Sequence, residues 1–437
     1  MPQMKRVLFI AFYFPPISGG GVQRPLKFVK YLPEFGWLPD VLTISPGSIK
    51  SYVKDKMLLA EIPPEVTVHR AYFPDFTRLP LFRGSAAKIF FEPFKNRFLI
   101  PSNEVTWNPF AFRKAMKIIE RQRPQVILSS SPPNSVHLLG LRLSQKYFLP
   151  WVMDMRDEWI HPYNMKGFCN LPEGRQLKEV ELENRGLSAS NKIIAVSPLM
   201  KEHIIERTGA TPDKIEIISN GFDDSDYEDY EDVPPPKGEK FKIMIMGTLG
   251  WITSVQVFVE CLEQLIEAQQ IDPERIEISI LSQSRQNKLD EYFPKHFKAR
   301  TAGNFRFFGF QPHHRAIKMM SEHHAFILIL NPEGKSVISG RIFEYVRGRR
   351  PIIAFIPEDG EAADVIRATN TGEYCAPNSP EKMKAMLLKY YSRWENDEFN
   401  YRPNFDEIDK YNRKALTAKL AKVLDEVVEN AQSTRNR

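Results

Sequence analysis

The chain has 437 residues, of which 42% are hydrophobic and 26% charged, and a formal net charge of +6. These values are normal for a folded cytosolic protein of two or three domains. No apolar stretch approaches the roughly 20 residues that span a bilayer, which excludes an integral membrane helix. The three cysteines, Cys169, Cys261 and Cys375, lie far apart without metal-ligand spacing and predict buried thiols in a reducing compartment.

The first apolar run, residues 7–14, ends at Pro15-Pro16 and predicts a buried strand rather than a secretory signal. We therefore expect a cytoplasmic protein. Residues 223–232 hold seven acids and no base, so the rest of the chain is clearly basic. A basic surface indicates an anionic partner such as nucleotide phosphates, a phospholipid surface or nucleic acid.

Strands and helices are predicted to alternate through residues 1–225. KRVLFIAFYF predicts a strand buried on both faces, and PLKFVKYLPEFG a helix closed by glycine. The later segments are, in chain order, strand PDVLTIS, helix FRKAMKIIERQRP, strand QVILSSSPP, helix VHLLGLRLSQKYF and strands PWVMDMRDEW, NKIIAVSP and KIEIISNG. This alternation predicts an α/β domain with a parallel, doubly wound sheet.

An acidic and proline-rich linker is predicted at residues 226–240. The DSD triplet at residues 224–226, in the acidic run that leads into the linker, favours a solvated hinge over a metal site. The pattern then restarts, which predicts a second doubly wound Rossmann-like domain over residues 238–394. Residues 395–437 contain a long amphipathic helix that we expect to pack back on the first domain. Parallel sheets bind ligands at the carboxyl ends of their strands, so two such domains predict a central cleft.

A glycine cluster, Gly19-Gly20-Gly21, separates the first strand from the first helix. Backbone amides in such a turn can approach a phosphate or a sugar at a helix N-terminus. Arg24, in the first turn of that helix, would add positive charge. The cluster lacks the full dinucleotide-binding spacing, so a flexible loop is an equally good interpretation.

Charged residues gather directly after the strand PWVMD. They are Asp154, Arg156 and Asp157, followed by Trp159. Charges at the carboxyl end of a parallel strand lie where active sites are built. The alternative interpretation is an arginine–aspartate ion pair that closes the strand end, and the two interpretations are compatible.

The segment SGRIFEYVRGRRPIIAF provides a third cluster, beginning at Ser339. Gly340 would present free amides at a helix N-terminus, and Arg341 would add a cation there, which together suit a pyrophosphate. Glu344 lies one helical turn further, and its carboxylate could accept two hydrogen bonds from a ribose diol. The alternative is a capped amphipathic helix that precedes a strand.

With these clusters, the chain resembles the family-4 glycosyltransferases, which have the GT-B fold and retain anomeric configuration. It is most similar to the branch that makes bacterial surface polysaccharides. The segments that carry the resemblance occur in family order along nearly the whole chain: VLFIAFYFPPISGGGVQRPLKFVKYL, ILSSSPP, WVMDMRDEW, IIAVSP, IISNGFD, FRFFGF and SGRIFEYVRGRRPIIAF. The resemblance implies transfer of a sugar from a nucleoside-diphosphate sugar to a glycan or lipid-linked glycan. Because a helix N-terminus with Arg341 can stabilise the diphosphate, we expect no metal or other cofactor.

The resemblance also implies roles for particular residues. Arg156 and Asp157 would lie near the reacting sugar, and Asn220 and Gly221 at the domain junction. Asp154, from the same cluster after the strand, completes the predicted catalytic set. Glu344 matches the second of two glutamates spaced eight apart, the one that binds the donor ribose. The donor-binding set that follows is Gly20, Gly21, Arg24, Gly247, Ser339, Gly340, Arg341 and Glu344.

The sequence departs from the family pattern at two places, and Arg341 would therefore have to neutralise more of the diphosphate charge. Ser336 stands where many relatives have the first glutamate, and the turn after Gly247 lacks the arginine and lysine that neutralise a diphosphate. Arg285 and Lys335 are weaker substitutes. A non-catalytic homologue that binds nucleotide-sugar and a nucleotide-sugar epimerase of the same fold therefore stay open, whereas the lysine motif of a phosphorylase is not seen.

Residues 76–100 interleave aromatic and basic side chains with a single acid, Glu92. Such a stretch can lie on an anionic membrane, which would place the protein peripherally on the inner face of the membrane. The alternative is an insert whose aromatic side chains pack inward. A nucleic-acid partner is not expected, because the basic residues form no recognition helix or stacking sheet.

Overall fold

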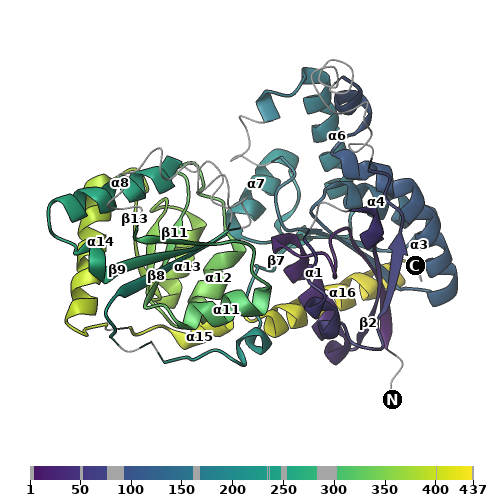
Figure 1. Ribbon diagram of the computed structural model, residues 1–437. Coiled ribbons are helices and arrows are strands. Elements are labelled where there is room, and N and C mark those ends of the chain that lie inside the picture. Colours follow the sequence, from purple (N-terminus) through teal and green to yellow (C-terminus); the bar gives the residue numbers. More distant parts are fainter. Residues whose placement is uncertain are drawn as a thin grey trace. The chain divides into compact units, whose positions relative to one another are not determined.

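The computed structural model describes residues 4–49, 53–75, 93–160, 168–233, 235, 237–247, 253–282, 303–399 and 401–435. The chain divides into two compact units. The first consists of Met1–Asn220 and Arg413–Arg437, and the second of Gly221–Asn412 (Figure 1). Within the described residues, a search for helices long and apolar enough to cross a bilayer finds none.

The first unit is built on a parallel sheet. Its described strands are β1 (Lys5–Ala11), β2 (Trp37–Ile44), β3 (Thr67–Ala71), β4 (Val126–Ser130), β5 (Trp151–Met155), β6 (Lys192–Ala195) and β7 (Ile215–Ile217). Their order across the sheet is β3-β2-β1-β4-β5-β6-β7, and every pairing is parallel. The chain therefore winds outwards in both directions from β1, as the alternating pattern predicts.

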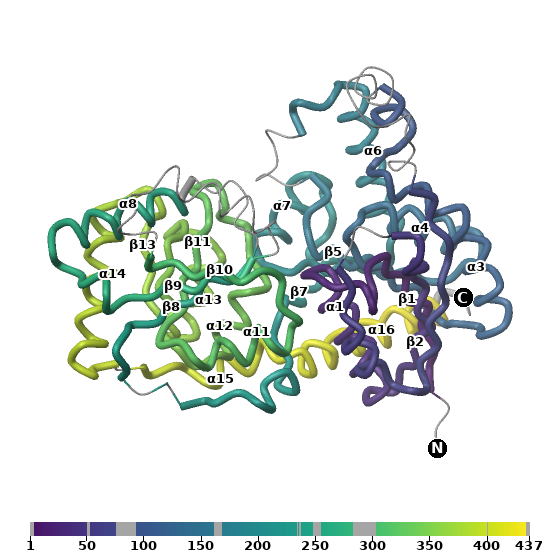
Figure 2. Tube along the Cα trace, viewed as in Figure 1, coloured from purple at the N-terminus to yellow at the C-terminus, as the bar shows by residue number. Residues whose placement is uncertain are grey.

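Helices cover both faces of this sheet. They are α1 (Gly20–Tyr31), α3 (Asn108–Gln122), α4 (Ser135–Tyr147), α6 (Glu173–Ala189), α7 (Pro198–Thr208) and α16 (Arg413–Arg435), with a further helical turn at 93–98. Short 3-10 helices are η1 (Leu32–Phe35), η2 (Pro46–Ser48), η3 (Met57–Glu61), η6 (Asn103–Trp107) and η8 (Pro212–Lys214). The C-terminal helix α16 lies beside α1, and Leu420 and Leu424 are fully buried in the first core (Figure 2).

The second unit has a parallel sheet of strand order β10-β9-β8-β11-β12-β13. The described strands are β8 (Phe241–Met246), β9 (Ile276–Leu281), β10 (Phe305–Phe308), β11 (Ala325–Ile329), β12 (Ile352–Phe355) and β13 (Gly372–Cys375). The helices are α8 (Thr253–Glu267), α11 (His313–Ser321), α12 (Gly340–Arg347), α13 (Glu361–Thr369), α14 (Pro380–Glu395) and α15 (Phe405–Asp409), with η9 (Asp224–Tyr227) and η10 (Pro273–Arg275).

Alternate side chains of β8 enter two different cores, because successive residues of a strand point to opposite faces. Ile243 and Ile245 pack with residues of α8 and α14, whereas Met244 and Met246 pack with residues of α11, α12 and α13. The second sheet is thus buried on both faces, which explains why its strands read as continuous apolar runs.

Residues 223–233, here called the acidic strap, belong to the second unit and pack against its α12. Tyr227 and Tyr230 are buried, and their hydroxyls donate to carbonyls of α12 and the residue that follows it. Arg350, which is 0% exposed, donates to the carbonyl oxygens of Glu231, Asp232 and Val233. The sequence predicted a solvated hinge here. The segment instead packs on the second unit, because two of its tyrosines are buried and a buried arginine binds its carbonyl oxygens.

Candidate functional site

In the first unit, the glycine loop and the charged residues after β5 come together. Gly19 has a φ of +120°, a conformation that favours glycine, and leads directly into α1. A Cβ built on Gly20 would lie 3.4 Å from one terminal nitrogen of Arg156, and a Cβ on Gly21 would lie 3.7 Å from the other. The Arg156 guanidinium therefore lies directly beside these two glycines, at the N-terminus of α1.

Arg156 provides positive charge beside a helix end that is already positive. Among the described residues, its ion-pair partner is Asp157, with 3.9 Å between Nη1 and Oδ2. The Asp157 side chain is 63% exposed, so the pair is weak, whereas Arg156 is 18% exposed. The N-cap residue of α1 is Gly19, and no side chain of the described residues caps this helix end. A guanidinium next to uncapped helix amides is a suitable place for an anion.

Arg24 and Asp154 lie in the interior of the same unit. Both side chains are 0% exposed, and Nη2 of Arg24 lies 2.7 Å from Oδ1 of Asp154. Arg24 also donates to the carbonyl oxygens of Ile218 and Ser219, and the Ser130 hydroxyl donates to Asp154. These contacts tie α1 to β5 and to the end of β7. They do not support the predicted roles of Arg24 in donor binding and Asp154 in catalysis.

In the second unit, Gly247 and Arg341 meet at the carboxyl end of β8. Gly247 has a φ of +109°, and a Cβ built on it would lie 2.5 Å from Cζ of Arg341. The Arg341 side chain donates through Nη1 to the carbonyl of Met246, and through Nε to the Ser339 hydroxyl at 3.0 Å. The backbone conformation at position 247 thus favours glycine, and any larger residue there would displace the Arg341 guanidinium.

The N-terminus of α12 lies at the same strand end. Ser339 is the N-cap residue, but its side chain makes no capping hydrogen bond and accepts from Arg341 instead. The backbone N–H of Met246 donates to the Tyr345 hydroxyl at 2.7 Å, which fixes α12 to β8. Burial raises the pKa of Tyr345, so this hydroxyl stays neutral. The helix end and the Arg341 cation are therefore held in a fixed relation.

Glu344 lies one turn further along α12, with its side chain 22% exposed. His313, the first residue of α11, lies between two carboxylates. Its Nε2 is 3.0 Å from Asp226 of the acidic strap, and its Nδ1 is 3.9 Å from Glu344. The sequence interpretation missed His313, and it named Asp226 only as part of the DSD triplet of the predicted hinge. The Gln-Pro-His-His run after the strand FRFFGF was a polar signal at a strand's carboxyl end and could have been noticed.

The structure describes one of the two weaker candidates for neutralising a diphosphate. Lys335 is already paired with Asp359. Arg285 and the turn at 248–252 lie outside the described residues. Among the candidates that the structure describes in the second unit, Arg341 is the cation held at a helix N-terminus.

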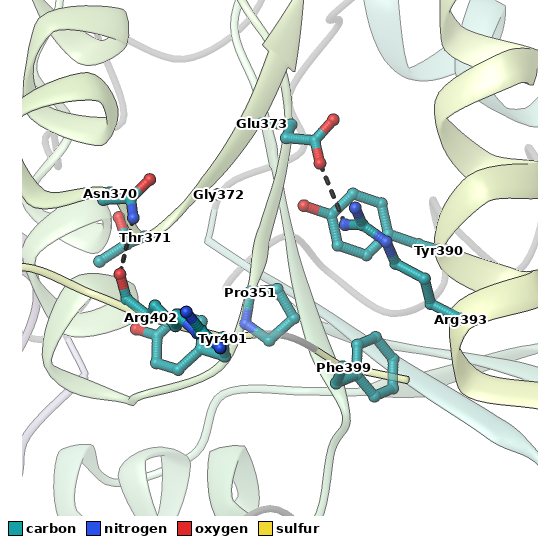
Figure 3. A pocket seen from close by; sticks show the side chains of 10 residues that line it. All are labelled: Pro351, Asn370, Thr371, Gly372, Glu373, Tyr390, Arg393, Phe399, Tyr401 and Arg402. Atoms are coloured by element: carbon teal, nitrogen blue, oxygen red, sulfur yellow. Dashed lines mark hydrogen bonds and ion pairs between the residues drawn. The ribbon is translucent and has the colours of Figure 1, made fainter. Parts of the chain in front are cut away.

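A small pocket of about 140 Å³ occurs in the second unit, at the opposite edge of its sheet (Figure 3). It is lined by Pro351 and Gly372, which lie at the amino ends of β12 and β13, and by Glu373, which pairs with Arg393 at 3.1 Å. Because Gly247 and Arg341 lie at a carboxyl strand end, this pocket is separate from the candidate site.

Comparison with known proteins gives one family match and many structural similarities. Residues 82–226 match the model of Glycosyltransferase Family 4. No curated protein matches the chain. Sucrose-phosphate synthase from Thermosynechococcus elongatus is similar with a TM-score of 0.67 and 12% identity, over 98% of this chain and 100% of that chain.

Two further solved structures are similar over almost their whole length. A glycosyltransferase from Rickettsia africae has a TM-score of 0.62 and 16% identity, over 98% of this chain and 99% of that chain. A trehalose 6-phosphate synthase from Burkholderia multivorans has a TM-score of 0.64 and 10% identity, over 99% and 98% respectively. At such identities these similarities show the fold.

The two parallel, doubly wound sheets and these structural similarities confirm the predicted GT-B fold. The match over residues 82–226 is to a family defined by glycosyl transfer. Residues 82–226 are thus similar to Glycosyltransferase Family 4, and this match, on a chain with the GT-B fold, supports a glycosyltransferase.

Proposed function

We propose that this glycosyltransferase moves a sugar from a nucleoside-diphosphate sugar to a hydroxyl acceptor, with retention of anomeric configuration. The observation that carries the proposal is the Arg341 guanidinium, seated on Gly247 at the N-terminus of α12. A helix N-terminus with a fixed arginine matches the charge and the hydrogen-bond geometry of a diphosphate. The resemblance in sequence supports retention.

The donor would bind with its diphosphate at Gly340 and Arg341 and its ribose at Glu344. The bond between the anomeric carbon and a diphosphate oxygen breaks, and a bond from that carbon to the acceptor oxygen forms. The acceptor's hydroxyl proton passes to the departing diphosphate. Fixed amides and the guanidinium stabilise the negative charge that develops on the leaving group, so we propose that no metal is required.

Arg156 and Asp157 are proposed to act in the first domain, near the reacting sugar. The exposed Asp157 carboxylate could stabilise an oxocarbenium-like centre, and Arg156 could orient an anionic group of the substrate. The arrangement of Arg156 at the N-terminus of α1 supports this assignment.

The acceptor is proposed to be a glycan or a lipid-linked glycan in cell-envelope or exopolysaccharide synthesis. A peripheral position on the inner membrane face would fit a lipid-linked acceptor. The candidate membrane segment covers residues 76–100, and its residues 76–92 lie outside the described residues. At its described end Phe94 and Phe98 are 43% and 61% exposed, and Arg97 lies over the Phe98 ring. Exposed aromatic side chains beside a base support membrane contact.

The first experiment is a thermal-shift screen against UDP-, GDP-, ADP- and dTDP-sugars, because a ligand that binds the folded state raises its unfolding temperature. The donor that stabilises the protein is then incubated with and without glycan acceptors. We expect transfer only with an acceptor. An epimerised nucleotide-sugar formed without acceptor would indicate the epimerase alternative, and binding without turnover would indicate the non-catalytic one.

Liposome co-sedimentation tests the membrane position. We expect binding to vesicles of anionic lipid at low salt, weakened when Phe94 and Phe98 are both replaced by serine. No sedimentation of the unmodified protein at low salt would overturn this part of the proposal, without bearing on transfer.

A further inference from the structure

The pocket at the amino edge of the second unit's sheet lies apart from the candidate donor site (Figure 3). We propose that it binds a small organic monoanion, namely a carboxylate carried on a single ring or a short apolar chain. Its volume is about 140 Å³. An apolar cavity of about 150 Å³ holds one benzene ring, so a nucleotide or a disaccharide is too large for this pocket.

The less exposed part of the lining consists largely of ring side chains. They are Pro351, Tyr390, Phe399 and Tyr401. Pro351 and Tyr390 are buried, and Phe399 and Tyr401 are half-buried. Apolar ring faces favour the body of an organic ligand over a bare hydrated ion, because the contact removes apolar surface from water.

The more exposed part of the lining carries a net positive charge. Arg393 and Arg402 provide two guanidiniums, and Glu373 is the one acid among the lining residues. Figure 3 shows the two arginines on opposite sides of the pocket. Arg402 is exposed, and no residue that the structure describes forms an ion pair with it. An occupant with a single negative charge would therefore balance the lining.

The ion pair of Arg393 leaves this side chain available to a ligand. Its Nη1 lies 3.1 Å from Oε1 of Glu373, and the other oxygen of Glu373 accepts from Lys389 at 2.6 Å. The side chains of Arg393 and Glu373 are 34% and 37% exposed, so their pairing contributes little to stability. Lys389 can keep Glu373 neutralised while Arg393 turns towards an anion.

The Tyr390 hydroxyl is a further hydrogen-bond donor for an anion. Figure 3 shows it on the side of the ring that faces away from α14. This hydroxyl makes no hydrogen bond within the described part of the chain, and it is not fully covered, so an occupant can reach it. Burial raises the pKa of Tyr390, so the hydroxyl keeps its proton. A carboxylate can accept from a hydroxyl and from a guanidinium together.

The test compares three ligands of the same shape and different charge by saturation-transfer NMR on the full chain. They are benzoate, neutral benzamide and cationic benzamidine. We expect benzoate to bind at least about tenfold more tightly than benzamide, because only benzoate makes hydrogen bonds as a charged acceptor, and benzamidine not to bind. Absence of benzoate binding, or benzamide binding of equal strength, would overturn the inference. Inorganic phosphate that displaces benzoate more readily than unlabelled benzoate displaces its deuterated form would overturn the assignment to an organic anion.

Three variants place the bound benzoate in this pocket. Arg402→Gln and Tyr390→Phe should each weaken its binding by roughly fivefold or more, since each removes a hydrogen bond to a charged acceptor. Glu373→Gln should strengthen it by roughly two- to fivefold, because it removes a like charge and releases Arg393. Damage to the fold would not produce such a gain. Benzoate affinities unchanged in all three variants would place the binding elsewhere and overturn the inference.

Two controls match these substitutions. Arg315→Gln replaces an exposed arginine of α11, and Tyr391→Phe replaces the next residue of α14, which packs in the core and does not line the pocket. Both should bind benzoate like the unmodified protein, and losses as large as those of the pocket variants would contradict the assignment. Nucleotide-sugar binding, measured in parallel, tests the proposed function separately, because Arg341 lies at the carboxyl end of β8.

Discussion

Replacing Gly247 by alanine should impair donor binding almost as much as removing Arg341 itself. The added Cβ would lie 2.5 Å from Cζ of Arg341, and closer than 3.0 Å one of the two groups must move. The Arg341 guanidinium is the more mobile of the two groups, so it would move away from position 247 and lose its hydrogen bond to the Met246 carbonyl. The φ of +109° adds backbone strain in any residue other than glycine.

The magnitude follows from the interaction that is lost. A hydrogen bond to a charged group contributes about 1.5–3 kcal/mol, which corresponds to a roughly 10- to 150-fold loss of affinity. Arg341→Ala removes this interaction fully. Gly247→Ala should reach the lower part of that range and should also destabilise the second domain by about 1–3 kcal/mol through strain.

The assay is calorimetric titration with the nucleotide-sugar that gives the largest thermal shift, followed by transfer kinetics. Arg315→Ala is the matched control, because Arg315 is an exposed arginine of α11 in the same unit. Arg341→Lys should recover only part of the affinity, since an ammonium keeps the charge but not the guanidinium geometry. Urea unfolding separates the loss of stability in Gly247→Ala from its loss of affinity.

An affinity of Arg341→Ala for the donor within about twofold of that of the unmodified protein would refute the predicted role of Arg341. Such a change is smaller than the loss of one hydrogen bond to a charged group would cause. That role is refuted in part if Gly247→Ala binds normally while Arg341→Ala does not. That result would mean that Arg341 binds the donor in a conformation other than the one in which its guanidinium packs against Gly247.

Three further predictions concern other parts of the chain. Glu344→Ala should weaken nucleotide binding in calorimetry by about tenfold. His313→Ala should weaken it less, because His313 acts by holding the Glu344 carboxylate. If both variants bind the nucleotide as tightly as the unmodified protein, the ribose contact is contradicted. Asp154→Ala should cost about 3–5 kcal/mol in urea unfolding by leaving a buried guanidinium unpaired, and a loss below about 1 kcal/mol would count against this. Burial lowers the pKa of His137 to about 3 and of His323 to about 4, from 6.5, so their contribution to stability is complete above pH 6.5. It should fall by up to about 1.4 kcal/mol per pH unit for each histidine as the pH drops from about 6.5 towards about 4, and urea midpoints that do not change between about pH 7 and about pH 5 would refute this.

The sequence by itself determined the architecture. Strands that are buried on both faces must be apolar along their whole length, so segments such as KRVLFIAFYF and HAFILILN are recognisable without any partner. Their alternation with helices implies parallel sheets, because a parallel connection requires a crossover. The clusters at Gly19–Gly21, Arg156 and Arg341 could also be found, because they follow strand ends directly.

The tertiary structure decided which of these charges are buried and which stay accessible to solvent. Asp154 belongs to the same sequence cluster as Arg156 and Asp157, yet it turns inward and pairs with Arg24 at 2.7 Å. The direction of a side chain depends on what the opposite element offers, and a carboxylate on β5 meets an arginine of α1 only after the sheet has formed. Sequence spacing contains no information about that distance.

Long-range contacts also decided the second domain's site. The acidic strap looks like a solvated linker because its charges dominate its composition, whereas Tyr227 and Tyr230 anchor it and its Asp226 meets His313. Likewise, Gly247 and Arg341 are separate motifs in the sequence and become one site only where β8 ends against α12. Local pattern predicts secondary structure because it is a property of neighbouring residues, whereas a binding site is a property of residues that folding brings together.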